Sequence, residues 1–279
     1  MTLRRARALP AFLLLVATAC GTLSVDEEKK LGHEAQREVR ERFVMMRDRV
    51  VVNYLRALGA QMVEASDPAP FDFRFYAVED EEINAFALPG GAIYVHTGTI
   101  SKTQNAAELS GVIAHEIGHV SARHVARLYK TNRNTGIAAN VLTVVVAILT
   151  GNPYMANAAS LATGIAATAY TSQFGRDAER EADALAVEAM IRAGYDPRAL
   201  GSFFQTLLEE NRRTGLKPPP FLMSHPATDE RIQNVTTLIE KHPPYSAGRL
   251  DDGGKLEIIQ RRIELVAGTD TAEEDEDLP

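Results

Sequence analysis

Apolar and polar residues alternate with two different periods in the first third of the chain. Residues 24–63 are rich in charge, and their apolar positions recur at near-helical spacing, which predicts one helix or two. Residues 71–78 start with strict alternation and carry several aromatic side chains, which indicates a strand. Two further strands are predicted at 83–88 and 92–97, joined by a turn at Pro89-Gly90-Gly91. A small sheet is therefore expected in this part of the chain.

The helical period dominates the remainder. Asn105, followed three residues later by Glu108, resembles a capping pair and predicts a helix that runs to about Tyr129. An amphipathic helix is predicted over residues 177–193, and Gly194 directly after it is a typical helix terminator. The expected fold class is α+β and mainly α-helical.

Four other stretches have a distinct composition. Residues 217–220, Lys-Pro-Pro-Pro, indicate a loop, and 224–240 are expected to be a loop that enters a helix. Residues 137–150 and 155–170 are apolar and rich in small side chains, and each run is too short to span a bilayer. They are interpreted either as a hairpin that contacts a membrane or gates substrate, or as two buried helices.

The helix that begins near Asn105 carries His115-Glu116-Ile117-Gly118-His119, which has the H-E-x-x-H spacing. Side chains four residues apart lie on one face of a helix, so both imidazoles can reach one metal ion. Glu116 lies about 100° round the helix from His115, close enough to act on water at the metal without being a ligand. His124 would lie about 180° from His115, so it is expected to be structural or exposed and not a ligand. The spacing predicts a catalytic zinc site.

A catalytic zinc site needs three protein ligands and one open position, so a third ligand is expected from the helix over 177–193. On a helical wheel Glu179 and Asp183 fall within about 60° of one another on the apolar face, where an unpaired carboxylate is costly. Glu181 and Glu188 fall on the opposite side, which is expected to face water. Glu179 is therefore predicted to be the third ligand, and Asp183 to hold a ligand histidine from behind. The alternative exchanges these two roles.

Four motifs together resemble a known family. HEIGHVSARH and EREADALAVEAMIRAGYDP, with INAFALPGGAIYVHTGTI upstream and SHPATDERI downstream, are similar to the gluzincin metallopeptidases related to HtpX, BepA and LoiP. In that family the glutamate of the E-x-x-x-D motif is the zinc ligand, which matches Glu179 and Asp183. The resemblance implies a zincin-like domain with one Zn²⁺ per chain and a small β-sheet above the active-site helix. The sequence shows no helical repeat after the motifs, which places it nearer the compact LoiP-like branch.

Composition and the N-terminus indicate the setting. The chain has 279 residues, 45% hydrophobic and 24% charged, which is typical of a globular protein, and its net charge of −7 does not suggest a nucleic-acid partner. Arg4, Arg5 and Arg7 precede an apolar run that ends at Cys20, the only cysteine, as in a secretory signal. Cys20 resembles the acylated cysteine of a bacterial lipoprotein, although Ala17 stands where such sites usually have leucine. The alternative is an ordinary signal-peptidase site that leaves Cys20 as a free thiol.

These segments suggest a domain organisation. The predicted parts are a lipoprotein signal peptide (1–19), a zinc metallopeptidase domain (24–245), a C-terminal extension (246–268) and an acidic disordered tail (269–279). Acylation at Cys20 would anchor the chain at the periplasmic face of a bacterial membrane. Gly21 replaces the aspartate that usually retains lipoproteins at the inner membrane, so the outer membrane of a two-membrane bacterium is expected.

The predicted activity is zinc-dependent hydrolysis of peptide bonds, with Glu116 taking the proton from the attacking water. His225 and Arg231, both within the family-like SHPATDERI segment, are candidates for stabilising the oxyanion. Two alternatives stay open for His225. In BepA-like relatives a histidine in the matching H-P segment caps the zinc and keeps the protease latent, and a histidine in such a loop can also be purely structural.

An extended substrate could pair with the exposed edge of the 83–97 hairpin through main-chain bonds, which suits unfolded polypeptides. The expected edge residues are Asn84, Ala85, Phe86, Gly90 and Gly91. The resemblance implies misfolded or stalled envelope proteins as substrates, and contact with the outer-membrane assembly machinery. One rival interpretation is an envelope chaperone or assembly factor whose protease activity is latent or incidental. Another is a metal-stabilised structural domain, against which Glu116 argues because a closed structural zinc site needs no base.

Overall fold

The computed structural model describes residues 23–128, 173–215, 218–226, 228–242 and 248–276. Within these residues the chain is mainly α-helical with one three-stranded sheet, which confirms the predicted fold class. The predicted signal peptide, Cys20 and the two apolar runs between residues 137 and 170 lie outside the described residues. Among the helices in the described ranges, none is both long enough and apolar enough to cross a membrane.

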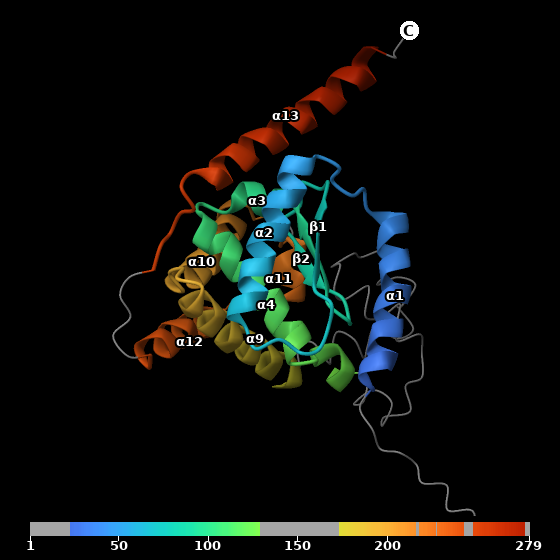
Figure 1. The fold of residues 1–279 in the computed structure, drawn as a ribbon. Coiled ribbons are helices and arrows are strands. Elements are labelled where there is room, and N and C mark those ends of the chain that lie inside the picture. Colours follow the sequence, from blue (N-terminus) through green and yellow to red (C-terminus); the bar gives the residue numbers. More distant parts are fainter. Residues whose placement is uncertain (1–22, 129–172, 216–217, 227, 243–247, 277–279) are drawn as a thin grey trace, which may run out of the picture.

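The three strands form a sheet in the order β1-β3-β2 (Figure 1). Their bounds are β1 Arg74–Val78, β2 Ala85–Ala87 and β3 Ala92–His96, each shorter than predicted. β1 pairs with β3 in parallel, and β2 pairs with β3 in the antiparallel direction. Gly90 and Gly91 have φ values of 82° and 104° in the connecting turn, a conformation that glycine adopts without strain. β2 is therefore one edge of the sheet.

Alternation along β3 gives the sheet two buried faces. Ile93 and Val95 join the main core, whereas Tyr94 belongs to a second, smaller cluster on the other face. α1 (Val25–Arg42) covers this second cluster, to which it contributes Val39. α2 and α4 pack against the opposite face (Figure 1). The sheet is thus enclosed between α1 on one side and the main helical layer on the other.

Besides α1, the part of the chain that the structure describes contains the helices α2 Arg49–Ala65, α3 Thr97–Lys102, α4 Ala106–Ser121, α9 Gln173–Arg192, α10 Arg198–Thr214, α11 Pro220–Ser224, α12 Asp229–Glu240 and α13 Lys255–Glu276. The segment 24–63 forms two helices, one of the two outcomes expected. No prediction was made for α10, whose Phe203 and Phe204 are fully buried. The loop that enters a helix over 224–240 is confirmed, because α12 starts at the N-cap Thr228.

α13 differs from the expected C-terminal extension and tail. Its first half contributes Leu256, Ile259 and Ile263 to the main core, so the helix is packed on the same core as the sheet and α4. The helix continues to Glu276, whereas residues 269–279 were predicted to be disordered. Ala272 and the three glutamates of that stretch have high helix propensity, and this outweighs the effect of like charges along the sequence.

α4 begins as predicted but ends earlier. The Asn105 side chain accepts a 3.0 Å hydrogen bond from the backbone N–H of Glu108, and the Glu108 carboxylate in turn accepts one from the backbone of Gln104. The helix ends at Ser121, not near Tyr129, because Arg123 adopts a left-handed conformation with φ 54°. Residues 124–128 are helical again after this break.

Candidate metal centre

The site depends on a close crossing of α4 and α9. A Cβ atom at Gly118 would lie 3.0 Å from the carbonyl oxygen of Ala182 and 3.2 Å from its Cα atom. The absence of a side chain therefore lets the two backbones approach. At this crossing His115 and His119 of α4 face Glu179 of α9.

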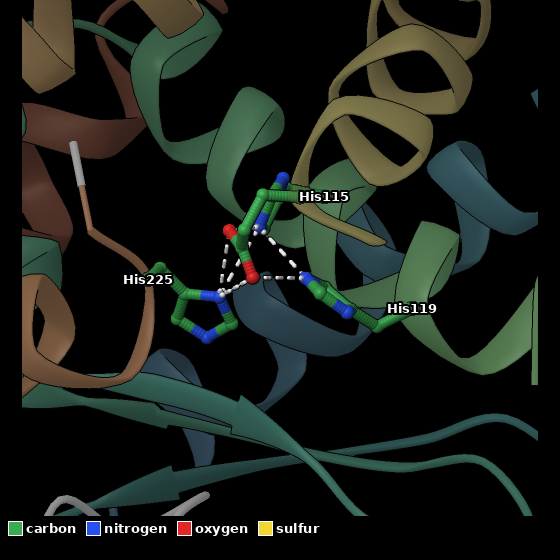
Figure 2. A group of neighbouring side chains, drawn as sticks. His115, His119 and His225 are labelled. Carbon is green, nitrogen blue, oxygen red and sulfur yellow. Dashed lines mark hydrogen bonds and ion pairs between the residues drawn. The ribbon is translucent and has the colours of Figure 1, made fainter. Parts of the chain in front are cut away.

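Four buried or nearly buried side chains bring their ligand atoms together (Figure 2). One atom from each of His115, His119, Glu179 and His225 lies within 4.8 Å of the others. The Nε2 atoms of His115 and His119 are 3.0 Å apart, and His225 Nδ1 lies 3.3 Å from His115 Nε2 and from both Glu179 oxygens. Three imidazole nitrogens and a carboxylate suit an ion such as zinc, so the donor set fits a bound metal. We call these four residues the donor cluster.

An ionic network lies behind His115. Asp183 Oδ1 is 3.0 Å from His115 Nδ1, and the Arg231 guanidinium donates to both Asp183 oxygens at 2.8 and 2.7 Å. Arg231 Nη1 is also 2.9 Å from Glu179 Oε2. Burial raises the pKa of Asp183, but Arg231 and His115 outweigh it and hold that pKa below its usual value. Burial lowers the pKa of His115, but Asp183 and Glu179 outweigh this effect and raise it to about 9.

Arg231 was predicted as a candidate for stabilising the oxyanion, but its guanidinium is already bonded to two carboxylates. Besides the two carboxylates, it donates to the carbonyl of Pro226 at 3.1 Å and stacks over the Phe204 ring at 4.5 Å. Its donors are therefore directed at the carboxylates and at the chain around it. The structure places Arg231 behind the cluster, where it neutralises Asp183 and Glu179.

Glu116 lies beside the donor cluster without belonging to it. Its Oε1 atom is 3.3 Å from His225 Nε2, and its carboxylate accepts a hydrogen bond from the backbone N–H of Ala87 in β2. Burial raises the pKa of Glu116, and the nearby His225 and His115 offset this only in part. A carboxyl with a raised pKa next to a metal site is suited to accepting and releasing protons.

The predicted substrate edge is an edge strand, but it is covered. Asn84, Ala85 and Phe86 are fully buried, and the Phe221 N–H of α11 donates to the carbonyl of Ile83 at 3.1 Å. In this conformation the side chains of the predicted edge residues are thus buried, and α11 contacts the chain at Ile83, just before β2. The two glycines of the turn pack closely against other parts of the chain. A Cβ atom at Gly90 would lie 3.2 Å from Lys29 Cα of α1, and one at Gly91 would lie 3.0 Å from Asp72 O.

His124 is buried and contacts His119, although it was expected on the far side of the helix. Its Nδ1 atom lies 2.8 Å from His119 Nδ1, and its Nε2 atom lies 3.2 Å from Glu181 Oε2. The angular prediction failed because α4 ends at Ser121. Burial lowers the pKa of His124 to about 4, and Glu181 only partly opposes this. As predicted, His124 is not one of the cluster residues.

The two acids expected to face water do so in part. The Glu181 side chain is 46% exposed and accepts a 2.6 Å bond from Arg127, and Glu188 forms an i,i+4 pair with Arg192. Sequence reasoning missed the contact between Glu181 and His124. The only signal for it was a third histidine within the ten residues HEIGHVSARH.

Comparison with known proteins confirms the resemblance. Residues 51–239 match Peptidase family M48. The chain is 33% identical over 246 residues to the Beta-barrel assembly-enhancing protease of Yersinia pestis, covering 86% of this chain and 50% of that protein. It is 30% identical to the protein of that name in Escherichia coli strain K12 (84% and 48% covered) and 30% identical to Metalloprotease LoiP of the same strain (60% and 62% covered). It thus spans about half the length of the Beta-barrel assembly-enhancing proteases it matches. The chain belongs to Peptidase family M48.

Proposed function

We propose that this protein is a zinc-dependent endopeptidase in which His115, His119 and Glu179 hold one zinc ion and Glu116 is the general base. Family membership and the donor cluster support this proposal. The observation that carries it is Glu116, a buried carboxylate with a raised pKa that lies against the cluster without being part of it. A purely structural site would be complete with four ligands and would have no use for such a group.

The chemistry divides between the ion and the chain. When bound, zinc supplies Lewis-acid chemistry that polarises a peptide carbonyl and lowers the pKa of water. Glu116 takes the proton from the attacking water and delivers it to the leaving amine. The Ala87 N–H, which donates to the Glu116 carboxylate, holds that group between β2 and the cluster. Asp183 and Arg231 hold His115 and Glu179 in place from behind.

His225 is proposed to cap the site and keep the enzyme latent. Its two ring nitrogens contact different partners: Nδ1 faces His115 and Glu179, and Nε2 faces Glu116. The ring therefore lies both among the groups that would hold the metal and next to the base, Glu116. An oxyanion-stabilising role is less well supported, because such a group would lie beside the donors and not among them.

The cap and the contact at the start of β2 come from one segment, α11 with its C-cap. His225 is the C-cap of α11, and the backbone N–H of Phe221 in the same short helix bonds to Ile83 at the start of β2. Displacement of α11 would remove the imidazole from the cluster and release the Ile83 carbonyl in one movement. An extended polypeptide that paired with β2 would then find the metal and Glu116 accessible.

The test uses the full chain loaded with zinc and a fluorescently labelled unfolded polypeptide such as casein. His225→Ala should cleave it faster than the wild type. Adding Glu116→Gln to His225→Ala should lower that rate roughly 10²–10⁴-fold, as expected for loss of a general base. Glu188→Gln, on the exposed side of α9, is the matched control and should leave the rate unchanged. If the double variant is as fast as His225→Ala, the assignment of Glu116 is wrong.

The alternative is an envelope chaperone or assembly factor with incidental protease activity. It is favoured by the name of the relatives from Yersinia pestis and Escherichia coli, which refers to β-barrel assembly. Glu116→Gln separates the two, because it should abolish cleavage while leaving binding of unfolded polypeptides and any assembly role intact. Loss of function in cells that carry a folded, zinc-loaded Glu116→Gln protein supports proteolysis as the function, and full complementation supports the alternative.

We further propose that the substrates are misfolded or stalled envelope proteins and that the chain is anchored through an acylated Cys20, with the outer membrane as its location. The support is the lipoprotein-like N-terminus and the similarity to proteases named for β-barrel assembly. A Cys20→Ala protein should move from the membrane fraction to the soluble fraction of cells. If it stays wholly with the membranes, the lipid anchor is wrong.

A further inference from the structure

His119 has a buried partner on the side that faces away from the donor cluster. His124 Nδ1 lies 2.8 Å from His119 Nδ1, while His119 Nε2 lies 3.0 Å from His115 Nε2 and 3.4 Å from Glu179 Oε1. The second nitrogen of His124 lies 3.2 Å from Glu181 Oε2, which also accepts from Arg127. A continuous chain of polar contacts thus runs from the donor cluster to the surface of α9.

The backbone break after α4 creates this arrangement. In a regular helix His124 would lie about 140° round the axis from His119, out of reach. The left-handed turn at Arg123 redirects the chain, and left-handed non-glycine residues carry a cost that the surroundings must offset. Here the Arg123 side chain donates to the buried Glu28 at 2.7 Å and to the Leu23 carbonyl at 2.5 Å. Contacts with α1 therefore hold His124 where it meets His119.

The contacts determine where the ring protons lie. Two imidazole nitrogens 2.8 Å apart share one proton, and a carboxylate can only accept. His124 therefore carries its proton on Nε2, toward Glu181, and accepts at Nδ1. His119 must then donate from Nδ1, which leaves the lone pair of its Nε2 atom directed at the cluster. The reverse arrangement would put a proton on His119 Nε2 and block its use as a ligand.

We propose that His124, held by Glu181, is a positioning residue that orients His119 and fixes its proton on Nδ1 for metal binding. It is the counterpart of Asp183, which lies 3.0 Å from the Nδ1 atom of His115. Glu116, Glu179 and Asp183 already place three carboxylates in the buried site. An intervening imidazole orients His119 without burying a fourth, because the carboxylate charge stays on the half-exposed Glu181. This inference rests on the proposed metal site.

The test measures metal affinity by competition with a chromophoric chelator, together with the visible absorption spectrum of the cobalt-substituted protein. His124→Leu should weaken zinc binding roughly 10–100-fold, the usual effect of removing a partner of a ligand histidine. His124→Asn keeps an acceptor oxygen near the position of Nδ1 and should recover most of the loss. Glu181→Gln should weaken binding less than His124→Leu does, and Glu188→Gln, on the same helix, should not change it.

Two results would overturn this role while leaving the metal site intact. One is wild-type affinity and an unchanged cobalt spectrum in His124→Leu. The other is equal weakening in His124→Leu and His124→Asn, which would reduce His124 to a packing residue. If His124→Leu does not fold, Glu181→Gln is the deciding variant. Unchanged zinc affinity in Glu181→Gln would show that the contact between Glu181 and His124 does not support His119. A wild-type chain that binds no metal would overturn the proposed function itself, and this inference with it.

Discussion

His115 and His119 stand one turn apart on α4, yet they are supported in opposite ways. Behind His115 lies an ionic network of Asp183 and Arg231, both buried. Behind His119 lies an imidazole, His124, and the carboxylate beyond that imidazole, Glu181, is half-exposed. The comparison shows two solutions to one requirement: a ligand histidine needs a partner for its second nitrogen, and that partner need not be a buried charge. Four substitutions test this difference between the two supports.

The largest effect is expected from the ligand carboxylate itself. Glu179 belongs to the donor cluster, whereas Glu181, two residues further along α9, reaches it only through His124. Glu179→Gln should abolish stoichiometric zinc, and Glu181→Gln should retain about one zinc per chain after dialysis, measured by elemental analysis. Equal losses in the two variants would show that the two faces of α9 are assigned wrongly.

Next in size is the cation of the inner network. Arg231→Met would leave Asp183 and Glu179 buried without their cation, so the free energy of unfolding of the metal-free protein should fall by about 3–5 kcal/mol. Chemical denaturation with and without zinc measures this. Saturating zinc should restore part of the loss, because it binds only the folded state. An unchanged unfolding midpoint would mean that Arg231 does not neutralise the pair.

Asp183 should have a smaller effect on the metal than Glu179. Asp183→Asn weakens the acceptor behind His115 but preserves its shape, so zinc affinity or activity should fall roughly 10–100-fold. Asp177→Asn, an exposed position on the same helix that pairs with Arg180, is the matched control. If the Asp183 variant stays within twofold of the wild type, the inner network does not support the ligand.

The smallest effect should come from the surface end of the outer support. Arg127 is 38% exposed where it pairs with Glu181, and such exposed pairs contribute about 0–1 kcal/mol. Arg127→Gln should therefore change the midpoint of thermal unfolding by a few degrees at most and leave zinc affinity nearly unchanged. A large loss of zinc would mean that the outer support depends on charge as much as the inner one does.

Local patterns were sufficient to identify the central features of the site. Spacing on α4 gave His115 and His119, and the wheel of α9 separated Glu179 and Asp183 from Glu181, because both arguments need only the helical period. The strands followed from two-residue alternation and turn residues, and the Asn105 cap from a local capping pair, which are equally local signals.

The remaining features depend on contacts between distant segments. Arg123 is left-handed because α1 binds its side chain, and nothing in the residues around it predicts that, since glycine or asparagine is the usual sign of such a turn. His124 was misplaced as a consequence. Arg231 was found in the right segment but given the wrong surroundings, because its position depends on how α12 packs against α9. The contact between α11 and Ile83, just before β2, was hidden for the same reason.

The large sequence separation within the donor cluster limits the enzyme to acting only after it has folded. His115 and His225 meet across 110 positions of sequence, so the donor set exists only after distant parts of the chain have folded together. Closing so long a loop is entropically costly and is achieved late, once many other contacts are formed. A newly made, extended chain therefore carries neither a complete metal site nor a working base. Its own folding acts as the first safeguard against premature cleavage.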